Sequence, residues 1–167
     1  MKKFLIIIFL FPITLFAQSD KSVSVKNVPQ TIPEHILKNY PSHTNVSYFI
    51  EKNADTMFYE ADFTYLKQKY SLLFDTLGNV FEIEIEISFK KLTESVKKLI
   101  EEKFSLDLKK YKIKKAQAVD YRGMMLYEIQ VRGTKNKDVD FYEYYFNRSG
   151  KFIKVETIDL KPIPSLY

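Results

Sequence analysis

Carboxylates alternate along one segment of the chain and are its residues best suited to chemistry. Glu82, Glu84 and Glu86 occupy every second position, and Glu60 and Asp62 show the same spacing earlier. In a β-strand, alternate side chains point to the same face, about 7 Å apart. Such carboxylates could bind Ca²⁺ or act as paired acids in hydrolysis.

No complete catalytic or metal-binding motif accompanies these acids. The chain has no Asp-x-Asp-x-Asp-Gly calcium loop, no cysteine, no Gly-x-Ser-x-Gly, no His-Glu-x-x-His and no glycine-rich phosphate loop. Its two histidines, His35 and His43, lack a third metal ligand at a readable spacing. We therefore expect no enzymatic activity, no metal and no cofactor.

Two β-hairpins are expected to position the carboxylates. In residues 70–86, alternating segments flank Asp75-Thr76-Leu77-Gly78, with Asp at the first and Gly at the fourth position of a type I turn. Residues 142–156 repeat this design around Asn147-Arg148-Ser149-Gly150. Each turn glycine is free to adopt positive φ in a hairpin bulge.

A predicted helix and two further strands precede each hairpin, so the chain reads as a tandem repeat. Helices are expected at residues 33–40, where Thr31 can cap the first turn, and at 93–104. The further strands are expected at 46–51, 57–65, 112–119 and 124–132. The predicted fold class is α+β, a tandem repeat of one helix plus a four-stranded antiparallel meander, with the helices on one face of a joined sheet.

These elements predict five segments. They are a signal peptide at 1–17, a flexible lead-in at 18–30, a first repeat at 31–89, a second repeat at 90–160 and a C-terminal tail at 161–167.

Several short motifs resemble the PepSY-like, β-lactamase-inhibitor-protein-like (BLIP-like) family of exported bacterial proteins. The matching features are Ile32-Pro33-Glu34, Tyr40-Pro41, Tyr59-Glu60, Tyr127-Glu128 and the two Phe-(Asp/Asn)-x-x-Gly turns at 74–78 and 146–150. The resemblance covers residues 28–155. It implies two tandem copies that join their sheets, helices on one face and an open, often concave face available to a partner. Inhibition of a secreted enzyme is the activity of one branch, but this chain lacks that branch's cysteines and has no match to an inhibitor contact loop.

The amino terminus has the form of a secretory signal peptide. Lys2 and Lys3 precede an apolar run that ends near Ala17. A membrane anchor is the alternative, but Pro12 interrupts the run, which is shorter than the roughly 20 apolar residues of a spanning helix. We expect cleavage near Ala17, a periplasmic or secreted protein, and no stable membrane insertion after cleavage.

The charge pattern gives no reason to expect nucleic-acid binding. The formal net charge is +5, and it falls by two when Lys2 and Lys3 leave with the leader. The one dense basic run, at residues 109–115, could be a nucleic-acid patch or a solvated edge strand whose lysines oppose aggregation. An exported protein rarely meets nucleic acid, so we expect the edge strand.

Strand alternation sorts the hairpin side chains into two faces. Phe81 is expected to face the helices, together with Tyr70, Leu72, Phe74, Tyr142, Tyr144 and Phe146. The other face mixes acids with aromatic and aliphatic side chains, which is typical of a protein interface. The candidate partner-binding residues are Phe58, Glu60, Asp62, Leu73, Glu82, Glu84, Glu128, Glu143, Tyr145, Phe152 and Lys154. The alternative is that these acids only keep an open sheet face soluble.

Three functional hypotheses remain open from the sequence. The first is an exported, non-enzymatic module that binds an exported or envelope protein through the open face, as an inhibitor-like or accessory factor. The second is a small-ligand or cation-binding module that uses the carboxylate-rich strands. The third is an enzyme with dispersed acids. The identity of the partner lies beyond the sequence.

Overall fold

The computed structural model describes residues 21–53 and 56–158. The predicted signal peptide at 1–17 and the predicted tail at 161–167 lie outside these ranges.

A single antiparallel sheet of nine strands forms most of the described chain. Every strand pairs with its neighbours in sequence, so the order across the sheet is β1 to β9 without a crossover. The strands are β1 (Lys21–Val23), β2 (Thr44–Asn53), β3 (Thr56–Tyr65), β4 (Gln68–Phe74), β5 (Val80–Glu86), β6 (Lys110–Tyr121), β7 (Met124–Lys135), β8 (Asp138–Asn147) and β9 (Phe152–Ile158). Two α-helices, α1 (Thr31–Asn39) and α2 (Glu94–Asp107), and two single 3-10 turns, η1 (Val25–Asn27) and η2 (Phe89–Lys91), complete the described elements.

The predicted fold class, a tandem repeat of α+β modules, is wrong. The structure is one continuous, predominantly β-sheet fold, in which β5 pairs with β6 from Glu82 opposite Tyr121 to Glu86 opposite Gln117. A ninth strand also lies at the edge, because Lys21–Val23 pairs with β2 instead of forming a flexible lead-in. The similar turns in the two halves suggested separate modules, but local turn chemistry carries no information on how the halves pair.

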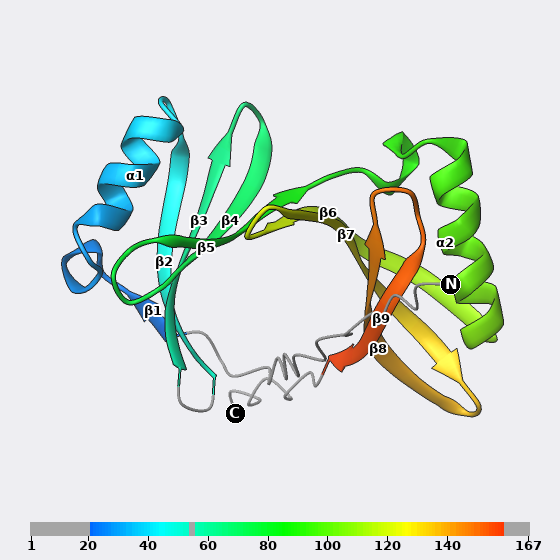
Figure 1. Cartoon of the computed structure of the whole chain (residues 1–167). Coiled ribbons are helices and arrows are strands. Elements are labelled where there is room, and N and C mark those ends of the chain that lie inside the picture. Colours follow the sequence, from blue (N-terminus) through cyan, green and yellow to red (C-terminus); the bar gives the residue numbers. More distant parts are fainter. Residues whose placement is uncertain (1–20, 54–55, 159–167) are drawn as a thin grey trace, which may run out of the picture.

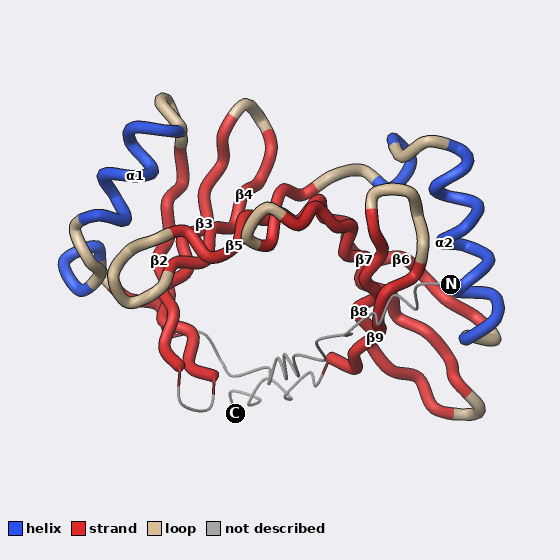
Figure 2. Tube along the Cα trace, in the orientation of Figure 1, coloured by secondary structure: helices blue, strands red, loops and turns tan. Residues whose placement is uncertain are grey.

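The sheet bends like an arch, with both helices on its outer side (Figure 1). The strands form an unbroken band between the two helical ends (Figure 2). We call the inner side, which neither helix covers, the open face.

Two hydrophobic clusters hold the helices on the outer side of the sheet. Under α1, the fully buried Ile32 and Ile36 pack against side chains of β3 and β4, among them Phe63 and Phe74. The ring of Tyr40, which ends α1, lies 4.9 Å from that of Phe63. Under α2, the core residues include Val96, Ile100, Phe104, Ile129, Tyr144 and Phe146.

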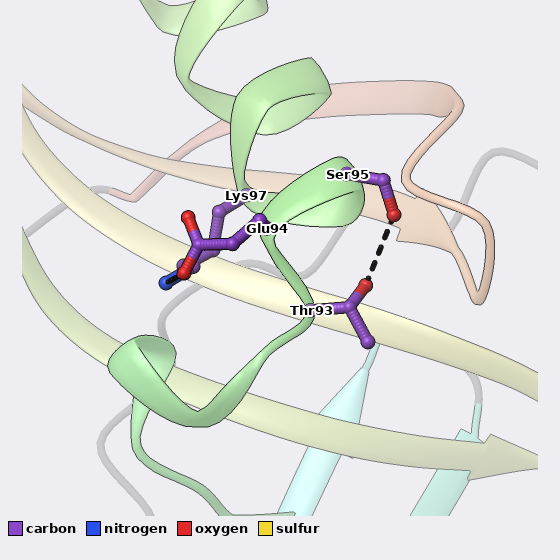
Figure 3. A network of polar contacts seen from close by, with 4 residues as sticks. All are labelled: Thr93, Glu94, Ser95 and Lys97. Atoms are coloured by element: carbon purple, nitrogen blue, oxygen red, sulfur yellow. Dashed lines mark hydrogen bonds and ion pairs between the residues drawn. The ribbon is translucent and has the colours of Figure 1, made fainter.

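The start of α1 differs from the predicted cap at Thr31. Thr31 is already helical and donates a hydrogen bond from Oγ1 to the Leu77 carbonyl, at 3.3 Å, so it joins α1 to the β4–β5 turn instead of capping α1. At α2, Thr93 is the N-cap residue and its hydroxyl contacts that of Ser95 at 3.2 Å (Figure 3). Lys97 donates to Glu94 beside it.

Both predicted hairpin turns are confirmed. Gly78 and Gly150 have φ of +83° and +85°. The amide of each glycine donates to the carbonyl of the first turn residue, Asp75 at 3.0 Å and Asn147 at 2.9 Å. These contacts depend only on neighbouring residues, which is why the sequence could predict them.

A β-bulge directly after each turn reverses the predicted direction of several side chains. Leu73 lies opposite Glu82 while Phe74 lies opposite Val80, so Phe81 is the extra residue. The ring of Phe81 contacts open-face rings, so its predicted core position is wrong. In the second hairpin, Phe152 lies opposite the buried Phe146 and beneath the Lys103 ammonium group, so its predicted place on the open face is wrong.

The basic run was predicted to form an edge strand, and it does form a strand, but not one at the edge of the sheet. The lysine-rich part of β6 belongs to a strand within the sheet, since β6 pairs with both β5 and β7. However, the pairing with β5 uses only residues 117–121, whereas the pairing with β7 begins at Lys110. The lysines at 110–115 therefore extend past the registered end of β5.

Alanine at Gly150 should destabilise the protein more than alanine at Gly123. Both glycines have positive φ, but a Cβ at Gly150 would lie 3.1 Å from backbone atoms of Val96 in α2, whereas a Cβ at Gly123 would meet nothing within 4 Å. We expect Gly123→Ala to lower the free energy of unfolding by about 1 kcal/mol and Gly150→Ala by about 2 to 3 kcal/mol, as measured by urea unfolding. Equal losses would contradict the close packing of the β8–β9 turn against α2.

Candidate functional site

An acidic cluster occupies the open face where β5 to β8 lie side by side. We use this name for Glu82, Glu84, Gln117, Glu128, Gln130, Glu143 and Tyr145. Five of these residues were predicted from the sequence, and the sheet brings them together because alternate residues of neighbouring strands share a face. Strand alternation placed Gln130 on this face without marking it as a site residue, and Gln117 was missed, because only the strand order shows that it lies between the acids.

On the β5 side of the cluster, two carboxyl groups share a hydrogen bond. Glu82 and Glu84 are hydrogen-bonded to each other through their carboxyl groups. Glu84 also accepts a hydrogen bond from the Nε2 of Gln117 on β6. The Gln117 side chain is only 3 % exposed, so its amide is held inside the sheet face.

On the β8 side, Glu143 is the central acceptor. Its Oε1 accepts from Nε2 of Gln130, and its Oε2 accepts from the Tyr145 hydroxyl, both at 2.8 Å. The Glu128 carboxyl is hydrogen-bonded to Glu143 as well. Glu128 and Tyr145 face each other across β7 and β8 and are both buried.

Removal from water raises the pKa of three cluster carboxyls. Burial is the main cause for Glu82, whose pKa rises to about 8, and the neighbouring Glu84 charge adds to it. Burial also raises the pKa of Glu84, and it raises that of Glu128 well above its usual range, with the charges of Glu84 and Glu143 adding to the effect. Glu82 and Glu84 keep some solvent exposure, but the concave sheet surrounds their carboxyl groups with protein on most sides.

Two oxygen atoms at the borders of the cluster are buried without a hydrogen-bond donor among the described residues. They are Oε1 of Gln117 and Oε2 of Glu156, which lies on β9 opposite Glu143. The second Glu156 oxygen, Oε1, accepts from Lys154 at 2.8 Å. The Lys154 ammonium group also lies 4.2 Å from the centre of the Tyr145 ring, so this predicted site residue closes the cluster at β9.

Beside the cluster lies the aromatic row, which consists of Phe58, Phe81 and Tyr121. The ring centres of Phe58 and Phe81 are 4.8 Å apart, and those of Phe81 and Tyr121 are 5.2 Å apart with perpendicular planes. All three side chains are half-buried. Tyr121 lies opposite Glu82, so the row adjoins the acidic cluster. Only Phe58 was predicted as a site residue, because the bulge at Phe81 cannot be seen in the alternation.

The remaining predicted residues lie on the open face outside the cluster. Glu60 accepts a hydrogen bond from Ser71 at 2.6 Å, and Leu73 lies between Glu60 and Glu82 across β3, β4 and β5. Asp62 lines a hollow of about 320 Å³ that also contains Gln117.

The histidines and acids do not form a metal site in the part of the chain that the structure describes. No group of three or more His, Asp or Glu side chains there is placed to hold a metal ion. His43 contacts the Tyr40 carbonyl at 2.8 Å through Nδ1, and the His35 ring packs 5.6 Å from Phe74.

Within residues 21–53 and 56–158, none of the helices is both long and apolar enough to cross a membrane.

The raised carboxyl pKa values predict that stability falls as pH rises. Between the ordinary value of 4.5 and about 8, folded Glu82 keeps a proton that the unfolded chain has lost. The free energy of unfolding should therefore decrease across this range, by up to about 1.4 kcal/mol per pH unit for each such group.

Urea unfolding at about pH 5 and about pH 8 tests this linkage. Glu82→Gln cannot lose a proton, so it should show a smaller loss of stability than the wild type between the two pH values. Glu102→Gln, on the exposed side of α2 near Lys98, is the control and should keep the wild-type loss. The same loss in wild type and Glu82→Gln would contradict the burial of this acid.

No protein-family model matches the chain, and no curated protein matches it at a significant level.

Three solved bacterial structures are similar to this fold. A BLIP-like protein from Bacteroides fragilis matches with a TM-score of 0.60 and 17% identity, over 84% of this chain and 92% of its own. A DUF2874 family protein from Bacteroides ovatus has a TM-score of 0.61 and 18% identity, over 78% and 87% of the two chains. A protein provisionally described as periplasmic, from Bacteroides eggerthii, has a TM-score of 0.62 and 16% identity, over 78% and 88%.

These similarities concern the fold. They confirm the BLIP-like part of the expected resemblance at that level, whereas the single nine-stranded sheet rules out its two tandem modules. The described chain thus has the fold of BLIP-like and DUF2874 structures.

Proposed function

We propose that this protein is an exported, non-enzymatic module that binds an exported or envelope protein through its open face, as an inhibitor-like or accessory factor. The aromatic row carries the proposal. Most large rings of the described residues pack beneath α1 or α2, whereas Phe58, Phe81 and Tyr121 lie half-exposed on the face that neither of these helices covers.

The composition of this surface supports a protein partner. Half-exposed aromatic side chains bordered by charged groups are common at the centre of protein interfaces, where a few aromatic and Arg residues supply most of the binding energy. Arg122 lies 5.3 Å from the centre of the Phe81 ring, which keeps a cationic group at the border of the row. A concave sheet also lets several strands contact one partner at the same time.

Two observations support export. The amino terminus reads as a signal peptide with cleavage expected near Ala17, a segment outside the described residues. The similar structure from Bacteroides eggerthii is provisionally described as periplasmic. The chain also has no cysteine, so its fold does not depend on a disulfide in either redox environment.

The hydrogen bonds of the cluster support a role without catalysis. Glu82 and Glu128 are each hydrogen-bonded to another carboxyl group, and Glu143 accepts from Gln130 and Tyr145. A general acid or base needs its reactive oxygen directed at a substrate or a water molecule. These contacts instead fix the carboxyl groups to each other.

The alternative of a small-ligand module has one observation in its favour. The hollow of about 320 Å³ is lined by polar side chains of several strands, including Asp62, Lys69, Ser71 and Gln117. Its polar lining suits a small hydrophilic ligand better than an apolar one.

Truncation of the aromatic row should abolish binding of the partner. Residues 18–167 serve as bait in a periplasmic extract, and the captured protein is identified, purified and titrated against the bait. For Phe58→Ala/Phe81→Ala we expect the Kd to rise by at least about tenfold, since each aromatic anchor contributes on the order of 1 to 2 kcal/mol. The control is Leu37→Ala/Leu106→Ala, which truncates exposed side chains on α1 and α2.

An unchanged Kd in the aromatic variant, or a loss confined to the helix variant, would contradict binding through the open face. Circular dichroism of both variants shows whether the fold is kept.

A further inference from the structure

The acidic cluster has more hydrogen-bond acceptors than donors. The side-chain donors there, from Gln117, Gln130 and Tyr145, all point to carboxylate oxygens. The buried atoms without a partner at its borders are both acceptors, one on Gln117 and one on Glu156. A group that completes this arrangement must therefore donate hydrogen bonds.

The orientation of the Gln117 amide makes its oxygen an available acceptor. Its Nε2 donates to the Glu84 carboxylate, and the reverse orientation would place two acceptors against each other. Oε1 therefore points away from Glu84. Because the side chain is 3 % exposed, leaving this oxygen without a donor costs on the order of 1 to 3 kcal/mol.

The charges around the cluster are unbalanced. The charged side chains that face it come from β2 and from the five strands β5 to β9, and they are Glu51, Glu82, Glu84, Lys115, Glu128, Glu143, Lys154 and Glu156. Six carboxyls thus face two lysines. Glu86 lies next to them but already pairs with Lys69 at 3.3 Å. This excess of carboxyl groups over lysines is confined to the cluster, because the whole chain has a formal net charge of +5.

The Gln117 side chain borders a hollow of about 320 Å³, whose charged lining residues are Asp62, Lys69, Glu86 and Lys115. Oε1 itself is buried, so a donor reaches it only when the Gln117 side chain shifts toward this hollow. This volume accommodates a single long side chain, such as that of Lys or Arg, together with the ends of neighbouring groups.

We propose that the acidic cluster receives a Lys or Arg side chain of the protein partner, whose N–H groups bind Oε1 of Gln117 and the neighbouring carboxylates. This inference rests on the proposed function, since it names the chemistry of the partner for the same face. An ammonium or guanidinium group carries three or five donors and one positive charge, which matches both the unpaired acceptors and the excess of carboxyls. The aromatic row lies beside the cluster and would hold the apolar part of the same segment.

Binding exchanges a proton for the cationic side chain. A protonated carboxyl in the free protein loses its proton to solvent when the ammonium or guanidinium group arrives, and the resulting carboxylate pairs with that cation. The bound state has the same net charge as the free state, with one proton released. Affinity should therefore be higher at about pH 8 than at about pH 5.5.

Side-chain amide NMR signals of Gln117 provide the test. The probes are the acetylated tripeptide amides Gly-Lys-Gly and Gly-Arg-Gly, with Gly-norleucine-Gly as the neutral control and calcium chloride as the metal control. We expect saturable shifts of the Gln117 signals with the cationic peptides alone. Glu84→Gln and Glu128→Gln should raise the half-saturation concentration by about tenfold or more, whereas Glu102→Gln on α2 should leave it unchanged.

Glutamine at position 128 keeps the size and the neutral charge of the protonated acid, so this variant should fold. Equal shifts with the neutral peptide, shifts with calcium alone, or no shifts would each overturn the proposal. If the captured partner still depends on Phe58 and Phe81 in those cases, the binding function stands and only the cationic chemistry fails. If the peptides bind but no partner depends on the aromatic row, the proposed function fails separately.

Discussion

The pairing of β5 with β6 is the constraint on which the rest of the structure depends. Without it, the strands under α1 and those under α2 would form two sheets, each with an additional exposed edge. The ladder from Glu82 opposite Tyr121 to Glu86 opposite Gln117 joins them into one. Both α1 and α2 cover the same side, so among residues 21–53 and 56–158 no helix lies on the other face of the sheet. On that face the acids of β5 meet those of β7 and β8.

Carboxyl groups at the centre of this face lower the stability of the fold. Removing Glu84 and Glu128 from water disfavours their charged forms, and their mutual repulsion adds to the cost. Hydrophobic pairs at such positions are often equally or more stabilising. The bonded carboxyl pairs limit the cost, because each can hold a proton and share one negative charge between two groups. Because these buried carboxyl groups lower stability, their presence on the open face is better explained by recognition of a partner than by folding.

The sequence was sufficient wherever a contact is local. Asp75 and Gly78 define their turn within four residues, so both hairpins could be predicted. The bulges that follow could not, because a one-residue shift in pairing leaves no trace in the alternation, and this reversed Phe81 and Phe152. Gln117 was missed for a different reason: its importance depends on two strands that are distant in sequence. The continuity of the sheet is equally non-local, which is why two similar halves were read as separate modules.

The negative charge of the acidic cluster can be compensated by lysine side chains or by protons, and this difference explains how the open face could select a partner. Lys115 and Lys154 lie at the borders of the cluster, while at its centre burial and neighbouring carboxyl groups raise the pKa of Glu82 and Glu128, which favours their protonated forms. A central lysine from the chain itself would neutralise the acids permanently and fill the space with its own side chain. A proton occupies no such volume and can be displaced by a cation from outside. On the proposed function, the protonated carboxyls therefore reduce the negative charge of the face in the free protein while leaving its electrostatic preference available to the partner.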